Sequence, residues 1–328
     1  MLDKNAPFYA LIFGATFVLT LIIEKALVPF LKNKAKQPIY SDGPRWHEAK
    51  SGTPTMGGLA FLISITTTLG AVISYSFASG KNDLATSLLI SLIFSIANAL
   101  IGLVDDLKKL IRNENKGLTA KEKIILQVTA AVGFLILRAI FIDEPTNLVF
   151  SFGILDAGII YYPCALLLLV GIVNMANLTD GIDGLASGVG FTAAVSLFYI
   201  SAALVPETAF ISSAIIGGSL GFLFFNINPA KIFMGDTGSL FLGALLVSAS
   251  FMLSNPLVTL SVNSVYIIEG ASVILQVTVF KLTKRRVFKM APLHHHFEKC
   301  GWSESKICFA SILLTLISSI PAYILYTP

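Results

Sequence analysis

The stretch IGLVDDLKK places two adjacent carboxylates, Asp105 and Asp106, directly after the uncharged segment 84–104. Neighbouring like charges repel each other and raise each other's pKa unless a positive group lies between them. The pair is therefore either a solvated helix end or a site for a metal ion, a proton or a phosphate. Because the C-terminal end of a helix disfavours negative charge, we expect a partner cation, either a bound Mg²⁺ or a lysine.

A second acidic motif, NMANLTDGIDGLASG, contains Asn177, Asp180 and Asp183 among glycines and has no lysine or arginine. If this stretch is helical, Asp180 and Asp183 share a face. The alternative is a turn rich in Asn and Asp, whose side chains cap helix N-termini. Three polar groups between two apolar segments favour a functional site.

A third motif, NINPAKIFMGDTGS, begins at Asn226 and places Asp236 just before another apolar segment. A helix N-terminus at that point favours anions and phosphates, although Asp236 also suits a plain helix cap. Phe233 is an aromatic residue in a polar loop, which suits stacking on a base or anchoring at the membrane interface. The motif lacks the GK[ST] ending of a Walker loop.

Two further stretches contain unusual residues. GPRWHEAKSGTPTMGG offers Lys50 and Thr55 to an anion, or forms a tight re-entry into the membrane. MAPLHHHFEKCGW holds His294–His296 beside Cys300, without the ligand spacing of a typical zinc site. Histidine can also bind phosphate or transfer protons near neutral pH. Glu269 lies inside an apolar segment, where an acid is either functional or buried against a polar neighbour.

The composition determines the class of protein that carries these motifs. Of the 328 residues, 55% are hydrophobic and 13% are charged, and the mean hydropathy is +0.80. A soluble domain is about one-quarter charged. We therefore predict an all-α integral membrane protein, with residues 1–328 forming a single polytopic domain. Three cysteines without paired spacing give no disulfide framework.

Apolar segments long enough to cross a bilayer need about 20 residues. Ten segments qualify: 8–30, 56–78, 84–104, 124–142, 157–176, 185–205, 208–226, 237–254, 257–280 and 307–327. The segments 237–254 and 257–280 are separated at Ser254–Pro256, because asparagine and proline together mark a turn. The segment 143–158 alternates weakly between turn signals, which predicts a short outer hairpin.

The lysines and arginines predict the orientation of these spans. Nineteen of the 23 lie in the loops 32–55, 105–123, 227–236 and 281–306, which all fall on one side of a ten-span protein. Basic loops face the cytoplasm. Both termini are therefore expected outside the cytoplasm, and the polar motifs are expected together at the cytoplasmic face.

Carboxylates, lysines and histidines at one face of a helical bundle suit phosphate chemistry with Mg²⁺. The spans would supply a groove for a lipid, so the residues alone favour a lipid–phosphate transferase. The rival class is a transporter, which also uses intramembrane acids. Transporters place their site near the middle of the membrane, often between repeats, and this distribution of polar residues counts against that class.

These motifs together resemble the phospho-N-acetylmuramoyl-pentapeptide-transferase branch of the polyprenyl-phosphate N-acetylhexosamine-1-phosphate transferase superfamily. The resemblance covers almost the whole chain, through RWHEAKSGTPTMGG, LVDDLKK, NLTDGIDGLA, NPAKIFMGDTGSLFLG and PLHHHFEKCGW. It implies that undecaprenyl phosphate attacks UDP-N-acetylmuramoyl-pentapeptide, that lipid I and UMP form, and that Mg²⁺ is required. It also implies a bacterial plasma membrane, allows a homodimer, and involves no nucleic acid.

The resemblance assigns roles to individual positions. The essential residues of the family correspond to Asp105, Asp106, Asp236 and His294, with Asp236 as the metal ligand. Positions that bind the nucleotide-sugar or nucleoside inhibitors correspond to Lys50, Thr55, Lys121, Asn177, Asp180, Asp183, Asn226, Phe233 and His295. A one-step transfer and a two-step route through an aspartyl phosphate both remain compatible with these residues.

Overall fold

The computed structural model describes residues 5–32, 50, 52–112, 117–142 and 146–326. Within these ranges, nine helices are long and apolar enough to cross a membrane. They are α1 (Ala6–Lys32), α2 (Gly58–Ala78), α3 (Asn82–Arg112), α4 (Ala120–Phe141), α5 (Tyr161–Thr179), α7 (Pro206–Asn226), α8 (Gly235–Met252), α10 (Ser264–Thr283) and α12 (Glu304–Tyr326). The predicted all-α membrane architecture is confirmed.

The shorter elements complete the chain. They are β1 (Asn147–Phe150), β2 (Gly153–Asp156), the 3-10 turn η2 (Gly158–Ile160), α6 (Leu185–Ser201), α9 (Val258–Val262) and α11 (Leu293–Glu298). The antiparallel pair β1–β2 is the hairpin predicted from the alternating pattern. The predicted segment 185–205 forms α6, whose 17 residues span about 26 Å at 1.5 Å per residue, slightly less than the roughly 30 Å hydrocarbon core.

Two predicted boundaries are wrong. The segment 84–104 was expected to end before the aspartate pair, whereas α3 continues to Arg112 and includes both carboxylates. Lys109 and Arg112 in its last turn complement the helix dipole and support this extension. The segment 257–280 was expected to be one helix, but Asn263 separates α9 from α10. The predicted break at Ser254–Pro256 is confirmed, since α8 ends at Met252.

The helix α8 lies at the centre of the bundle and is in contact with α2, α3, α5, α6 and α7. In its most apolar window 89% of residues are buried, compared with 28% for α4. Side chains of α8 belong to both buried apolar clusters, with Phe241 in one and Leu240 in the other. Helix α8 is therefore the element around which the others pack, whereas α4 presents most of its surface outward.

Glycines bring two helices against the start of α8 without side chains between them. A Cβ atom on Gly102 of α3 would lie 2.3 Å from the backbone oxygen of Asp236, and one on Gly58 of α2 would lie 2.3 Å from Gly238. Any larger residue at either glycine would push the helices apart. These contacts place the carboxylates of α3 beside the first turn of α8.

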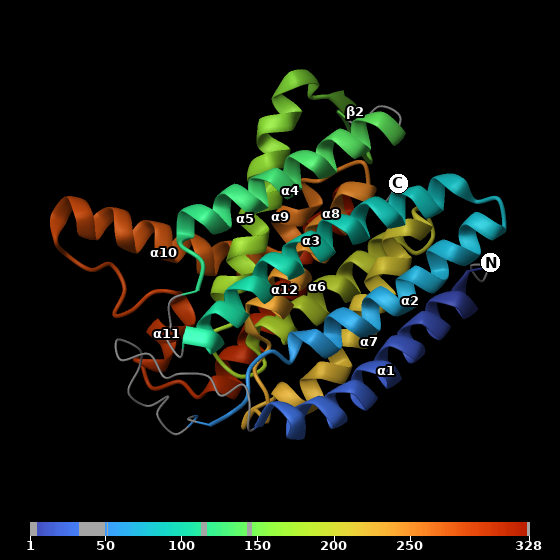
Figure 1. Cartoon of the computed structure of the whole chain (residues 1–328). Coiled ribbons are helices and arrows are strands. Elements are labelled where there is room, and N and C mark those ends of the chain that lie inside the picture. Colours follow the sequence, from blue (N-terminus) through green and yellow to red (C-terminus); the bar gives the residue numbers. More distant parts are fainter. Residues whose placement is uncertain (1–4, 33–49, 51, 113–116, 143–145, 327–328) are drawn as a thin grey trace.

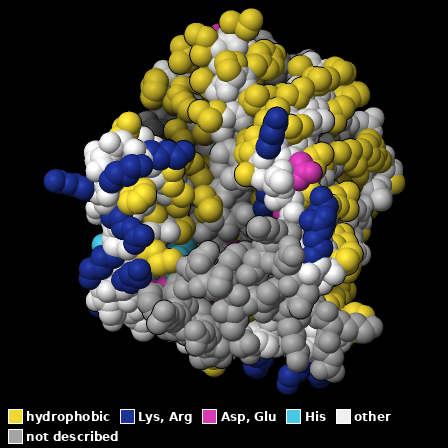
Figure 2. All heavy atoms as spheres, turned by 60° about the vertical axis from the view of Figure 1, so that its left-hand side comes forward, with side chains coloured by type: hydrophobic (Ala, Val, Ile, Leu, Met, Phe, Trp, Pro, Cys, Tyr) yellow, Lys and Arg dark blue, Asp and Glu magenta, His cyan; other side chains and the backbone are white. Residues whose placement is uncertain are grey.

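Most of the helices, such as α1, α2, α3 and α7, run roughly side by side, so the bundle has two distinct ends (Figure 1). The start of α1, the end of α12 and the β hairpin lie toward one end, and α11 lies toward the other (Figure 1). Figure 2 views the molecule from the side of α10 and α11, where lysine and arginine side chains gather near histidines. The exposed basic residues after α10 include Lys284, Arg285, Arg286 and Lys289.

Candidate active site

Three carboxylates meet where α3 touches the first turn of α8. One oxygen from each of Asp105, Asp106 and Asp236 lies within 4.8 Å of the others. Asp105 and Asp106 are buried, at 3% and 4% exposed, and Asp236 is partly buried. Among the described residues, no other group of three or more carboxylate, histidine or cysteine side chains has this geometry.

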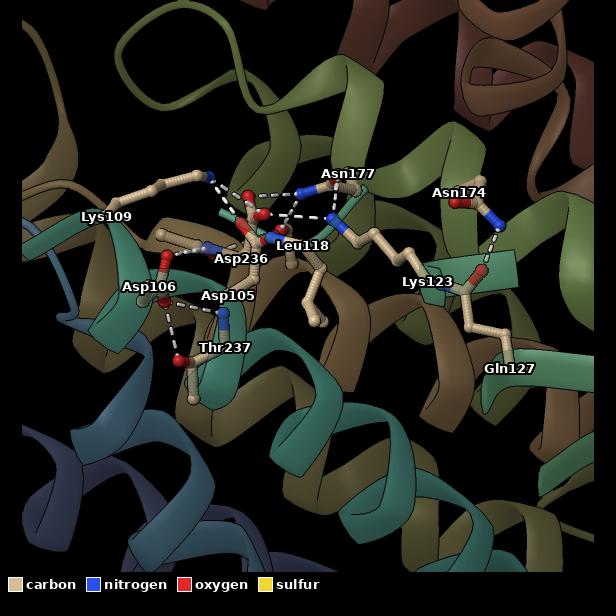
Figure 3. Close-up of polar contacts among 12 residues, drawn as sticks. Asp105, Asp106, Lys109, Leu118, Lys123, Gln127, Asn174, Asn177, Asp236 and Thr237 are labelled. Carbon is tan, nitrogen blue, oxygen red and sulfur yellow. Dashed lines mark hydrogen bonds and ion pairs between the residues drawn. The ribbon is translucent and has the colours of Figure 1, made fainter. Parts of the chain in front are cut away.

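Two lysines supply the positive charge that the aspartate pair requires (Figure 3). The Nζ atom of Lys109 lies 2.6 Å from Asp105 Oδ2 and 3.0 Å from Asp236 Oδ2. The Nζ atom of Lys123, from α4, lies 2.9 Å from the same Asp236 oxygen and donates to Asn177 Oδ1 at 3.2 Å. In this arrangement the partner cation predicted from the sequence is a pair of lysines.

Neither lysine was among the site residues predicted from the sequence. The signal for Lys109 was its i,i+4 spacing from Asp105, which places both on one helix face once α3 is known to continue. Lys123 is placed by a capping box, in which Thr119 and Glu122 exchange hydrogen bonds at the start of α4. Lys121, the lysine that was expected here, is exposed in the first turn of α4.

Asp106 caps the first turn of α8 from the neighbouring helix. Its Oδ1 accepts from the backbone N–H of Asp236 at 3.1 Å, and its Oδ2 accepts from Thr237 N at 2.9 Å and Thr237 Oγ1 at 2.6 Å (Figure 3). These amides would otherwise be unpaired at a helix start. Asp236 is consequently not the plain cap that one interpretation allowed, and its own carboxylate is turned toward the lysines and Asn177.

The remaining oxygens of the cluster are held by neighbouring elements. Asp105 Oδ1 accepts from Leu118 N at 2.7 Å, in the turn before α4. Asn177, near the end of α5, donates to Asp236 Oδ1 at 2.9 Å and to Ser239 Oγ at 2.8 Å. Four helices, α3, α4, α5 and α8, therefore contribute to one network of ion pairs and hydrogen bonds (Figure 3).

Within the second acidic motif, residues 180–184 form a turn between α5 and α6, so Asp180 and Asp183 do not share a helix face. Asp183 is buried, and its Oδ2 accepts from Asn228 Nδ2 at 3.1 Å and from Ala230 N at 2.9 Å. Asn226 Oδ1 accepts from Gly184 N at 3.1 Å, and its amide donates to Ile232 O at 3.0 Å. These bonds join the turn to the loop that carries Phe233.

Lys50 extends the network to the first helical turn of α12. Its Nζ atom lies 2.7 Å from Asp183 Oδ1 and 2.7 Å from Glu304 Oε2, and Glu304 also accepts from Asp183 N at 2.9 Å. Glu304 was missed because it lies just after the last recognised motif, which ends at Trp302. Residues 43–49 and 51 of the motif around Lys50 lie outside the described part of the chain.

Thr55 and Phe233 lie in two backbone segments that pair beside the cluster. Phe233 N donates to Pro54 O at 2.9 Å, and Gly57 N donates to Phe233 O at 2.9 Å. A Cβ atom on Gly235, whose φ of +75° suits glycine, would lie 3.1 Å from Thr55 Oγ1. Thr55 is thus buried beside the loop before Asp236.

The histidines of α11 do not converge on one point. His294 is fully buried, and its ring Nδ1 lies 3.1 Å from Glu269 Oε2. His295 Nδ1 lies 2.6 Å from Glu298 Oε2. His296 Nε2 lies 3.7 Å from Cys300 Sγ. Three neighbouring histidines with three different partners do not make the zinc site that was one reading of HHH.

Asp180 follows α5 and lies outside the membrane-spanning helices. Burial, followed by the negative charges of Asp236, Asp106 and Asp183, raises the pKa of Asp180 from 3.8 to about 7. A carboxyl group that titrates near neutrality beside other carboxylates can take up or release a proton, and it can lose that proton when a cation binds nearby.

The fold and the site define a class: a multi-pass helical membrane protein with a carboxylate–lysine centre at one end of the bundle. Residues 88–254 match the model of glycosyl transferase family 4, and residues 50–62 match signature 1 of phospho-N-acetylmuramoyl-pentapeptide-transferase. The chain belongs to the phospho-N-acetylmuramoyl-pentapeptide-transferase family. Family membership makes it a transferase of bacterial peptidoglycan synthesis.

Three relatives illustrate the extent of the similarity, and each is named phospho-N-acetylmuramoyl-pentapeptide-transferase. The protein of Caldicellulosiruptor bescii is 41% identical over 306 residues, which cover 92% of each chain. That of Clostridium botulinum (strain Alaska E43 / Type E3) is 42% identical over 96% of this chain and 95% of its own. That of Staphylococcus haemolyticus is 41% identical over 92% of this chain and 94% of its own.

Removing Lys109 tests the charge compensation. Lys109→Gln leaves Asp105 and Asp236 without their shared cation, and a buried polar group left unpaired costs about 1–3 kcal/mol, with a higher cost for a charged group. We expect a lower melting temperature and at least a tenfold loss of transferase turnover. Lys108→Gln is the matched control, because adjacent helix positions point in different directions. Equal losses in both variants would show that only the overall positive charge matters.

Asp180→Asn tests the raised pKa of Asp180. Between about pH 4 and 7 the folded protein keeps a proton that the unfolded chain has lost, so the free energy of unfolding falls as pH rises through this window. Asparagine cannot ionise. In metal-free detergent solution we therefore expect Asp180→Asn to melt above wild type at pH 8 and at the same temperature near pH 4.

The control for this measurement is Asp156→Asn in the exposed hairpin. Hydrogen bonds from Gly158 N and Thr146 Oγ1 lower the pKa of Asp156, so its replacement should not raise the melting temperature at pH 8. If Asp180→Asn melts at or below the wild-type temperature at pH 8, the Asp180 carboxylate is not disfavoured in the folded protein.

Proposed function

We propose that this chain transfers phospho-N-acetylmuramoyl-pentapeptide from UDP-N-acetylmuramoyl-pentapeptide to undecaprenyl phosphate, forming lipid I and releasing UMP. The observation that carries the proposal is the cluster of Asp105, Asp106 and Asp236 with Lys109 and Lys123, in a chain of this family. Phosphoryl transfer depends mainly on positioning and on charge stabilisation. Carboxylates and lysines converging from three helices suit both tasks.

The same residues fit a Mg²⁺ ion. Mg²⁺ prefers oxygen ligands and binds through one or two carboxylates together with substrate phosphates, and the cluster offers three carboxylates within 4.8 Å. Asp236 would hold the ion, with Asp105 and Asp106 beside it. When bound, Mg²⁺ neutralises charge on the diphosphate. The Lys109 and Lys123 ammonium groups, which now contact Asp236, would then be free to turn toward phosphate oxygens.

Asp105 in this proposal positions the lipid phosphate more than it removes a proton. A phosphate monoester has its second pKa near 6 and is largely dianionic at pH 7. Asp105 is held by Lys109 and by Leu118 N, which favours a fixed orientation. Asp106 is the more structural member, because its oxygens are bonded to the start of α8.

The nucleotide-sugar would lie over the turn after α5 and the loop before α8. The residues proposed to bind it are Lys50, Thr55, Lys121, Asn177, Asp180, Asp183, Asn226, Phe233 and His295, with His294 acting at the transfer step. Asn226 contributes by shaping the turn, since its side chain is bonded to Gly184, Ser187 and Ile232. Phe233 is partly exposed and suits packing against uracil.

The site is proposed to face the cytoplasm. The start of α4 and the end of α10, which border described basic residues of the expected cytoplasmic loops such as Lys123 and Lys284, lie on the same side of the bundle as α11 (Figure 1). The start of α1 and the end of α12 lie toward the opposite end (Figure 1), which suits termini outside the cytoplasm. An even number of crossings requires α6 to be the tenth span. Its inclusion in the bundle beside α7 and α12 supports this count.

UMP release in detergent tests the activity and the role of Asp236. With both substrates and Mg²⁺, wild type should release UMP, and a chelator should abolish the reaction. Asp236→Asn should reduce turnover at least a thousandfold while the protein remains folded, because the central carboxylate of the cluster is lost. The matched control Asp156→Asn, in the exposed hairpin, should retain full activity.

Two outcomes contradict the proposal. Undiminished UMP release in Asp236→Asn, or in excess chelator, would exclude the carboxylate–metal centre. If wild type releases no UMP but proteoliposomes accumulate a solute, the protein is a transporter, because detergent removes the gradient that a transporter needs.

Cysteine labelling tests the orientation. In a variant without the three native cysteines, Lys81→Cys lies between α2 and α3, and Lys284→Cys follows α10; both positions are exposed. A membrane-impermeant thiol reagent applied to spheroplasts should label position 81, whereas position 284 should react only after permeabilisation. Labelling of both positions from the same side would refute the proposed topology.

A further inference from the structure

Glu269 is a buried acid of α10 that the proposed chemistry does not use. It is 4% exposed, and both of its oxygens face His294 of α11. The backbone N–H of His294 lies 3.1 Å from Oε1 and 3.2 Å from Oε2, and the ring Nδ1 lies 3.1 Å from Oε2. One carboxylate therefore holds both the backbone and the ring of this histidine.

This geometry determines which ring nitrogen of His294 carries the proton. An ionised carboxylate only accepts hydrogen bonds, and the approach of the backbone N–H to both oxygens of Glu269 favours the ionised form. Nδ1 is therefore protonated, and Nε2, which is buried with no hydrogen-bond acceptor among the described residues, keeps its lone pair. A carboxylate that fixes a histidine in this way sets its tautomer and its orientation.

The other ring nitrogen points into the nucleotide-sugar side of the site. His294 Nε2 is buried and has no hydrogen-bond partner within the described ranges. It lies against the turn after α5, because a Cβ atom on Gly181 would be 2.3 Å from Nε2. Gly181 stands between Asp180 and Asp183, so the ring supports the segment that carries both carboxylates. Buried acceptors without partners are rare and call for an explanation.

We propose that Glu269 is a positioning residue of the transfer reaction, which holds His294 in the Nδ1–H tautomer with an unprotonated Nε2 against the Asp180–Asp183 turn. The inference rests on the proposed function for its effect on turnover. The assignment of the His294 tautomer to Glu269 does not rest on that function, since the tautomer can be observed without substrate. Nε2 is then available to accept a hydrogen bond from the substrate when the turn adjusts around it.

A purely structural role, in which Glu269 only fastens α11 to α10, is the alternative. Gln276 fastens the loop before α11 to α10 in this way, because its side chain accepts from Val287 N and Phe288 N at 3.0 Å. A fastening residue would affect stability but would leave the tautomer of His294 unchanged. The two roles therefore differ in a spectroscopic property of one ring.

The experiment is solid-state NMR of the full chain in lipid bilayers with ¹⁵N-labelled histidine, of which there are four. His294→Asn identifies the signals of His294. We expect a protonated Nδ1 and an unprotonated Nε2 in wild type. In Glu269→Gln, the side-chain amide can donate to Nδ1, so a population with protonated Nε2 should appear. Glu298→Gln, the same change beside His295, should leave the His294 signals unchanged.

Kinetics complete the test. Glu269→Gln should lower kcat for UMP release at least about tenfold, the scale seen when orienting partners of functional histidines are removed, with a smaller change in KM for the nucleotide-sugar. Glu269→Asp, which keeps the carboxylate, should recover part of kcat. Gln276→Ala should lower the melting temperature without altering the His294 tautomer.

Three results would overturn the inference: a protonated Nε2 in the wild-type protein, an unchanged tautomer in Glu269→Gln, or a Glu269→Gln enzyme with full kcat. If Glu269→Gln does not fold, the wild-type tautomer and Glu269→Asp still decide. An absence of UMP release from wild type would refute the proposed function, whereas the tautomer measurement would judge the Glu269–His294 pair independently.

Discussion

Compensation of buried negative charge is the constraint on which the rest of this structure depends. Asp105, Asp106 and Asp236 are brought within 4.8 Å at the end of an apolar bundle, where unpaired charges are costly. Lys109 from α3 forms an ion pair with Asp105, and Lys123 from α4 forms one with Asp236. The backbone amides at the start of α8 donate hydrogen bonds to Asp106. The helices must therefore pack as they do for the charges to be tolerated.

The apolar segments, the hairpin and the break before Pro256 were predictable from the sequence, because hydropathy and turn residues are local signals. The aspartate-rich motifs were recognised as a common site for the same reason. The continuation of α3 to Arg112 was not, because charge was taken as the end of the span. Once that helix is extended, the i,i+4 pairing of Asp105 with Lys109 follows directly.

Other features depend on contacts between distant segments. Glu304 reaches Lys50 across 254 positions, and Gly102 meets Asp236 because two helices approach without side chains between them. Neither relation leaves a periodic pattern. The break at Asn263 was also hidden, since asparagine in an apolar run is a weaker signal than proline. Sequence reasoning thus predicted that these motifs lie together, while packing decided which of their residues touch.

The position of Lys123 on α4 links the site to the surrounding lipid. Helix α4 is one of the least buried spans, so its tilt responds to bilayer thickness, yet its first turns carry one of the two cations on Asp236. A thinner or thicker membrane would shift that ammonium group relative to a carboxylate held by the central helix. The hydrocarbon thickness of the host membrane is therefore expected to change the distance between Lys123 and Asp236, and with it the strength of their ion pair.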